Sequence, residues 1–173
     1  MSKEPPTVEL RIPSEMDGYW QSGTLILRFR QRLEYSSHVV LLCSADLATG
    51  EDLLKVGCNL LGWNLWCFVQ QLAEVHNTLV GSARLVNISG DLDILVTVVD
   101  QTRGMLSVQG LVADGLYPED LPDKMSGNAG IAMVFAGVTF DRSQLTEMLA
   151  ALGEFLKEVK VDGTEDPWGR RRR

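Results

Sequence analysis

NAGIAMVFAGVTFDRSQLTEMLAALGEFLKEV, from Asn128 to Val159, is a strand pattern that runs without a linker into a helix pattern. In its second half, apolar residues recur at the helical period, which predicts an amphipathic helix with one apolar face. These residues are Leu145, Met148, Leu149, Leu152, Phe155, Leu156 and Val159. Asp141, with Gln144 three residues later, forms a capping-box pattern. The helix is therefore expected to begin directly after Asp141.

The first half of the stretch alternates two sets of side chains, and both sets are largely apolar. One set is Ala132, Val134, Ala136, Val138 and Phe140, and the other is Ile131, Met133, Phe135 and Thr139. A strand that is apolar on both faces is typical of a central strand covered on both sides. Because it runs straight into the helix, we expect that helix to pack on the sheet to which the strand belongs.

The first part of the chain predicts three strands. Apolar and polar residues alternate over 8–12 and 23–33, and residues 38–47 are apolar enough to form a buried strand antiparallel to the second. Residues 48–57 are expected to form a loop. The polar face of the second strand carries a row of arginines at Arg28, Arg30 and Arg32. Such a row is typical of a solvated face that pairs with carboxylates on a neighbouring strand, and an anion site is the alternative.

A helix and a meander are predicted for the middle of the chain. Asn64 is expected to cap the helix, and Asn77 and Gly81 to end it. Trp63 and Trp66 at its start are interpreted as half-buried residues at a helix–sheet edge, with a partner-binding anchor as the alternative. Strands over 82–89, 92–99 and 105–113 then follow with short connections, a two-residue turn at 90–91 and a turn at 100–104. Such short connections require antiparallel neighbours.

Together these patterns predict an α+β fold: an antiparallel sheet or sandwich of about seven strands with two amphipathic helices, the second of them C-terminal. Residues 1–161 are expected to form one domain, and residues 162–173 a flexible C-terminal tail. The longest turn-rich segment, 114–127, separates the last strand of the meander from the strand that leads into the final helix.

Composition and charge narrow the class of protein. The chain has 173 residues and a net charge of −7, and because Arg170–Arg173 contribute +4, the rest carries −11. An acidic body repels phosphates, so a nucleic-acid partner is not expected, whereas a basic protein partner is favoured. No apolar run approaches the roughly 20 residues that span a bilayer, and residues 1–10 lack the apolar core of a signal sequence, so no secretory signal is expected. We therefore expect a cytoplasmic protein with no membrane segment, and reduced cysteines at Cys43, Cys58 and Cys67.

No pattern in the sequence predicts catalysis, a metal ion or a cofactor. The two histidines, His38 and His76, have no nucleophile motif around them, and the cysteines lack the paired spacing of a zinc site. The acidic loop over 114–123 lacks the glycine and the terminal glutamate of a calcium-binding loop. Residues 127–130, GNAG, lead into a strand and not into a helix, which is the wrong context for binding a phosphate. The chain is therefore not expected to be an enzyme.

The binding hypothesis rests on acidic residues in the turns of the meander and just after it. If these turns cluster, they form an acidic rim around two apolar contact residues, which suits a basic protein partner. The alternative is that acidic turns only keep the protein soluble. The residues of the predicted rim are Asp91, Asp93, Asp100, Asp114, Leu116, Tyr117, Glu119, Asp120 and Asp123.

The order of these parts resembles small bacterial immunity families and related uncharacterised families, with the WapI-type immunity proteins among them. The resemblance is carried by LILRFR in the early strand, the mid-chain helix, the meander, and FDRSQLTEMLAALGEFL at the end. It covers about residues 8–160 and transfers no binding residues. It implies a protein without enzymatic activity that neutralises a toxin domain by binding it.

We therefore expect a cytosolic protein-binding module, comparable to an immunity protein that neutralises a basic toxin domain. One alternative is a small ligand-binding protein or enzyme with a pocket between sheet and helices. A third is a homo-oligomer in which exposed sheet edges pair.

Overall fold

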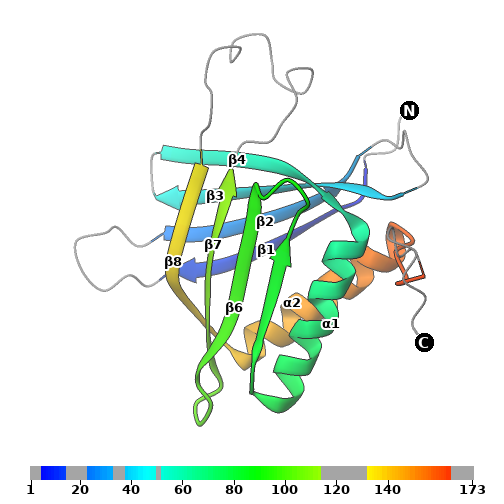
Figure 1. Ribbon diagram of the computed structural model, residues 1–173. Coiled ribbons are helices and arrows are strands. Elements are labelled where there is room, and N and C mark those ends of the chain that lie inside the picture. Colours follow the sequence, from blue (N-terminus) through cyan, green and yellow to red (C-terminus); the bar gives the residue numbers. More distant parts are fainter. Residues whose placement is uncertain (1–4, 15–22, 33–37, 50–51, 114–131, 165–173) are drawn as a thin grey trace.

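The structure is a computed structural model that describes residues 5–14, 23–32, 38–49, 52–113 and 132–164. These residues form eight strands and two helices (Figure 1). The first half contains β1 (Thr7–Ser14), β2 (Gly23–Gln31), β3 (Val40–Thr49), β4 (Asp52–Leu61) and α1 (Gly62–Thr78). The second half contains β5 (Ser82–Val86), β6 (Leu92–Asp100), β7 (Met105–Ala113), β8 (Ala132–Asp141) and α2 (Arg142–Glu158).

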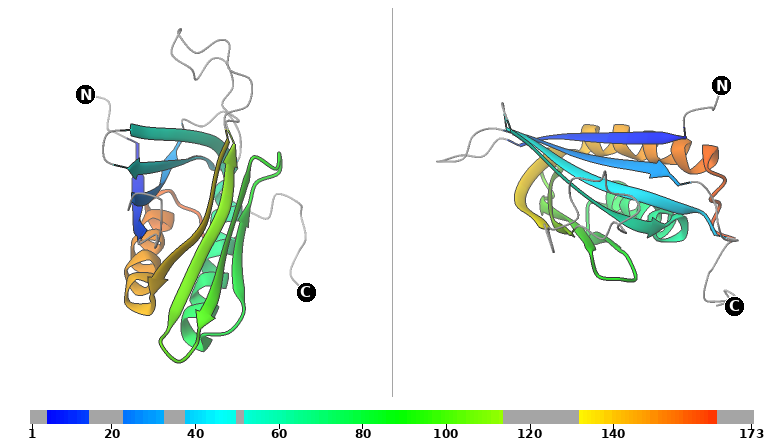
Figure 2. Two further views of the ribbon diagram at one scale, coloured as in Figure 1. Left: turned by 90° about the vertical axis from the view of Figure 1, so that its left-hand side faces the viewer. Right: turned by 90° about the horizontal axis from the view of Figure 1, so that it is seen from above.

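The chain follows the same order of elements twice, four strands and then a helix of 17 residues. Each group of four strands is an antiparallel meander, so the first sheet has the order β1-β2-β3-β4 and the second has the order β5-β6-β7-β8. Figure 2 shows the second sheet running across one end of the first, with the two helices side by side in the remaining space. The α+β prediction is confirmed, and the architecture is two packed sheets.

A single hydrophobic core lies between the two sheets and the helix pair. Both sheets contribute alternate residues to it, as in β1, where Val8, Leu10 and Ile12 are buried. Helix α1 packs mainly on β5, and α2 contacts α1, β1 and β8. The last helix was predicted to pack on the sheet of its own strand, but it packs as much on β1 of the first sheet.

The predicted strand count was one too low because residues 48–57 are not a loop. Residues up to Thr49 belong to β3, and β4 starts at Asp52 and pairs with β3 along its whole length. The turn residues at 50–52 predicted a loop, but Asp52, the last of them, already belongs to β4. Val56, Cys58 and Leu60 alternate inward from β4 and are buried, which is the ordinary pattern of a half-buried strand.

Strand β8 is an edge strand, which contradicts the prediction of a central strand covered on both sides. The side chain of Val134 is 75% exposed, whereas Phe135, Val138 and Phe140 are buried. Burial skips from residue 135 to 138 because the β7–β8 register shifts there, and Gly137 takes a φ of +70°. A β-bulge adds one residue to a strand and so exchanges its two faces, which strict alternation does not foresee.

The two helix starts differ in how they are capped. At α2 the predicted capping box is confirmed: the Asp141 carboxylate accepts from Gln144 N–H at 2.9 Å, and Gln144 Oε1 accepts from Asp141 N–H at 2.9 Å. The Asn64 cap prediction for α1 was wrong, since Leu61 is the N-cap and no side chain caps that end. The helix ends at Thr78 because the next residue, Leu79, is left-handed with a φ of 51°.

Candidate functional site

The described residues of the predicted acidic rim lie at two ends of one strand. Asp91 and Asp93 are at the start of β6, and Asp100 is at its other end. Ala113, the last residue of β7, donates its N–H to the Asp91 carbonyl oxygen at 2.7 Å and pairs with Ala132, the first residue of β8. The chain therefore leaves the second sheet at Ala113, beside Asp91, and re-enters it at Ala132, one strand farther from Asp91. The other rim residues, Asp114, Leu116, Tyr117, Glu119, Asp120 and Asp123, lie outside the described residues.

Asp93 is not available as a free carboxylate, because Arg84 on β5 binds it through two hydrogen bonds. Nε and Nη2 of Arg84 donate to the two carboxylate oxygens of Asp93 at 2.8 and 2.6 Å. These hydrogen bonds lower the pKa of Asp93, although partial burial opposes them. The exposed pair neutralises its own charge, so Asp93 contributes little to the attraction of a basic partner.

Asp100 has a local structural role. Its carboxylate accepts from the Arg103 N–H at 3.0 Å, and the Arg103 side chain lies 3.7 Å away as an ion partner. These contacts close the turn at 101–104, where Gly104 has a φ of +65°. The observed turn agrees with the one predicted from its glycine, and it holds Asp100 far along β6 from Asp91.

The β5–β6 hairpin presents exposed apolar side chains next to Asp91. Val86 at the end of β5 is 40% exposed, and Ile88 in the turn is 66% exposed. We call Val86, Ile88 and Asp91 the hairpin surface. The loop is longer than the predicted two-residue turn: Asn87 N–H donates to the Leu92 carbonyl oxygen at 3.3 Å across it.

Asn87 fixes this hairpin against the first sheet. Its Nδ2 donates to the Asn59 carbonyl oxygen on β4 at 3.0 Å, and its Oδ1 accepts from the Leu92 N–H at 3.1 Å. The amide therefore joins the turn to a rigid strand on one side and closes the loop on the other. Ile88 is thus presented from a loop with a fixed base. Sequence reasoning missed Ile88 because it placed residue 88 inside the strand predicted over 82–89, whereas β5 ends at Val86 and Ile88 lies in the turn.

The outer face of the second sheet continues this surface across all four strands. One row of successive cross-strand neighbours runs over the four strands and consists of Val86, Asp93, Leu111 and Val134. Leu111 is half-buried and Val134 is exposed. Within the described residues both helices lie on the opposite face of this sheet, as Figure 2 shows.

The prediction that the β2 arginines pair with carboxylates of a neighbouring strand is confirmed for Arg28. Arg28 donates to Glu9 on the neighbouring β1 at 2.9 Å from Nε and 2.8 Å from Nη2, and Arg11 contacts the same carboxylate at 2.6 Å. The hydrogen bond from Arg28 is the main cause of the lowered pKa of Glu9. Arg32 Nη1 donates to Asn59 Oδ1 at 2.8 Å. These contacts leave the anion-site alternative without support from Arg28 or Arg32.

Residues with reactive side chains occupy structural positions. His76 Nε2 and Thr146 Oγ1 share a hydrogen bond of 2.8 Å that joins α1 to α2. Cys43 and Cys58 are cross-strand neighbours, and burial, followed by the proximity of Cys58, raises the pKa of Cys43 well above its usual value. Trp63 and Trp66 stack with ring centroids 5.2 Å apart, and Trp66 packs against the core. Among the described residues, no group of three histidine, cysteine or acidic residues is placed to hold a metal ion.

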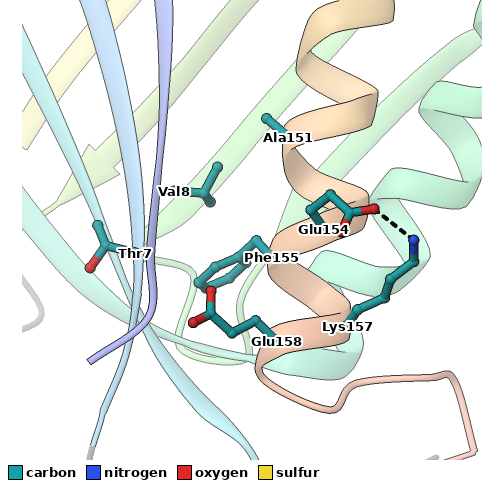
Figure 3. A pocket seen from close by; sticks show the side chains of 7 residues that line it. All are labelled: Thr7, Val8, Ala151, Glu154, Phe155, Lys157 and Glu158. Atoms are coloured by element: carbon teal, nitrogen blue, oxygen red, sulfur yellow. Dashed lines mark hydrogen bonds and ion pairs between the residues drawn. The ribbon is translucent and has the colours of Figure 1, made fainter. Parts of the chain in front are cut away.

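Two surface depressions lie beside the C-terminal half of α2. The first, of about 520 Å³, is bounded by Thr7 and Val8 of β1 and by Phe155 and Glu158 of α2 (Figure 3). Its remaining lining residues are Ala151, Glu154 and Lys157, and the last two, three residues apart on α2, form an ion pair of 2.7 Å. The second, of about 420 Å³, lies between the helices and includes Trp66, Lys160 and Asp162. Neither lining includes a histidine or a cysteine.

Comparison of the chain with protein-family models, with curated proteins and with solved structures returns no match. The resemblance to immunity families therefore stays a prediction. In the described part of the chain, neither helix is both long and apolar enough to cross a membrane.

Proposed function

We propose that this chain is a protein-binding module that holds a basic partner protein against the hairpin surface. The observation that carries the proposal is the β5–β6 hairpin, where Val86 and Ile88 are exposed next to Asp91 on a loop fixed by Asn87. Apolar side chains on a rigid base lose little freedom on binding, so they suit the centre of an interface.

Charge supports a basic partner over an acidic one. The chain carries a net charge of −7, and four of the predicted rim acids belong to the segment that leaves β7 next to Asp91. A basic protein would be steered to this end of the sheet, and its association would weaken as salt screens the attraction. Neutralisation of a toxin domain, which the resemblance to immunity families implies, is the specific form of this proposal.

The depression between β1 and α2 supports a ligand-binding alternative less well. Its floor includes the buried Val8 and Phe155, which leaves little apolar surface for a ligand to cover. Its charged side chains, Glu154 and Lys157, already pair with each other. A specific small-molecule site needs convergent polar groups in a deep apolar cavity, and this surface offers neither.

Affinity capture from a native lysate tests the proposal with two matched variants. Ile88→Lys places a positive charge in the hairpin surface, and Val80→Lys places one on a similarly exposed valine, 60% against 66%, at the opposite end of β5. We expect a basic protein that is retained by the wild type and by Val80→Lys, lost with Ile88→Lys, and released by salt. Equal retention by both variants, or partners indifferent to salt, would contradict the proposal.

A further inference from the structure

The four edges of the two sheets are protected to different degrees. Natural proteins protect edge strands with charged residues, proline, bulges or a covering element, because a bare edge pairs with other strands. In the first sheet, β1 carries Glu9, Arg11 and Pro13. The β4 edge is covered in part by Asn87, whose side chain binds the Asn59 carbonyl oxygen.

In the second sheet, α1 covers one edge and not the other. The outward N–H of Arg84 on β5 donates to Gln71 Oε1 of α1 at 2.8 Å. On β8 the run AMVFAGVTF, residues 132–140, contains no charged residue and no proline. Within the strand its protecting feature is the bulge at Gly137, and β8 also contacts β1 and β4 of the first sheet. Residues 132–136 themselves contain no charged residue and no proline, so this part of the edge lacks the devices seen at β1.

The register shows which backbone groups of this edge point outward. Ala113 bonds to Asp91 on the β6 side, so the alternation of an antiparallel ladder directs Val112 and Gly110 toward β8. Their partners on β8 are Met133 and Phe135, and the N–H and C=O groups of Val134 consequently point away from β7. Among the described residues, no loop or inter-element backbone hydrogen bond reaches Val134.

We propose that the β8 edge pairs with β8 of a second copy of this chain, antiparallel and with the two Val134 residues opposite each other. A two-fold axis at Val134 lets its N–H and C=O bond to the same groups of the other copy. The two exposed valine side chains then lie next to each other on the outer face. The two second sheets join into one continuous sheet.

The distribution of charge makes β8 the place where two copies of this chain can meet with the least repulsion. Two chains of −7 repel each other over most of their surfaces, and contact is least opposed where each is neutral. Strand β8 is such a place, because residues 132–140 are uncharged and the nearby Asp93 is neutralised by Arg84. Added salt screens the remaining repulsion and strengthens this association, which is the opposite of its effect on a basic partner.

Sedimentation velocity over a hundredfold range of concentration, at low and high salt, tests this pairing. We expect the wild type to form a dimer whose dissociation constant falls as salt rises. Val134→Lys brings two like charges face to face and is expected to be a monomer at every concentration. Val134→Pro removes the outward N–H without disturbing the β7 ladder, and it is expected to weaken the dimer in the same way.

Two controls keep the outcome interpretable. Val134→Thr retains a branched, uncharged side chain and is expected to remain dimeric. Val99→Lys adds the same charge at an exposed valine of β6, away from the edge, and is also expected to remain dimeric. Circular dichroism should show all four variants folded. A wild type that is monomeric at every concentration, or a Val134→Lys variant that dimerises as the wild type does, would overturn the proposal. Neither result would contradict the proposed binding of a basic partner at the hairpin surface, because Ile88 belongs to a different element.

Discussion

Replacing Gly110 by alanine measures how closely β6 and β7 approach at the second sheet's centre. A Cβ at this position would lie 2.6 Å from the Asp93 carbonyl oxygen, 2.8 Å from Phe135 Cζ and 3.1 Å from Ile94 Cα. Two of these atoms belong to the backbone of β6, which has a paired strand on each side and cannot rotate away. Phe135 is the register partner of Gly110, and its ring fills the space that a side chain would need.

The magnitude follows from the cost of inserting a methyl group into a packed site. Overpacking of this kind costs about 1–3 kcal/mol. A chain of this length loses about 2–4 °C in Tm for each kcal/mol. We therefore expect Gly110→Ala to lower the Tm by about 2–12 °C.

The matched control is Gly153→Ala in α2. A Cβ there would meet no atom within 4 Å, so only the helix preference of alanine acts. That preference stabilises the folded state by up to about 1 kcal/mol and raises the Tm. Differential scanning calorimetry of both variants then shows shifts of opposite sign. A Tm for Gly110→Ala equal to or above that of the wild type would refute the close approach of the two strands.

Three further measurements test other contacts. Gly163 has a φ of +80°, and a Cβ at this position would lie 2.5 Å from Trp66 Cζ2. Gly163→Ala should therefore lower the Tm and change the tryptophan fluorescence emission. An unchanged emission spectrum would show that this segment does not pack on the Trp66 indole. The lowered pKa of Asp93 means that its bond to Arg84 stabilises the fold above the pKa of the unfolded carboxyl, about 3.9, and less as pH falls through the lower folded value. Asp93→Asn should therefore have a lower Tm than the wild type at neutral pH and the same Tm as the wild type in strong acid. A difference in Tm that stays constant with pH would contradict this. Because Cys43 is buried and its pKa is raised, alkylation followed by mass spectrometry should find it slow to react until urea unfolds the chain; rapid native labelling would be inconsistent with the core.

The parts of the fold that depend on neighbours in the sequence could be predicted. The capping box of Asp141 and Gln144, the apolar face of α2 and the alternation of β1 all follow from spacing within a few residues. The meander could also be predicted, because its short connections leave antiparallel pairing as the main solution. Residues 162–164 were predicted to belong to the flexible tail because of their composition. In the structure Gly163 lies against Trp66, so this short segment packs on the domain.

Features that depend on a partner strand could not be predicted. The bulge in β8 reverses the exposure of Val134, and it forms where Gly110 on β7 lets Phe135 pack over the backbone. The acidic residues show the same limit. Their position in the turns of the meander predicted one rim containing Asp91, Asp93 and Asp100, whereas the structure puts Asp100 far along β6 and binds Asp93 to Arg84.

The repeated order of strands and helix explains where binding surfaces can arise. Each helix packs on the strand that opens the other half of the chain, α1 on β5 and α2 on β1, so neither half covers its apolar surface alone. The inner faces of both sheets and the inner faces of both helices therefore belong to one shared core. Among the side chains whose burial the structure describes, the exposed apolar ones lie mainly on the second sheet and its first hairpin, at Val86, Ile88, Val99 and Val134. Because the first sheet covers its edges with charge and with Asn87, recognition of another molecule is best sought on the second sheet, at the hairpin surface for a basic partner and at β8 for a second copy.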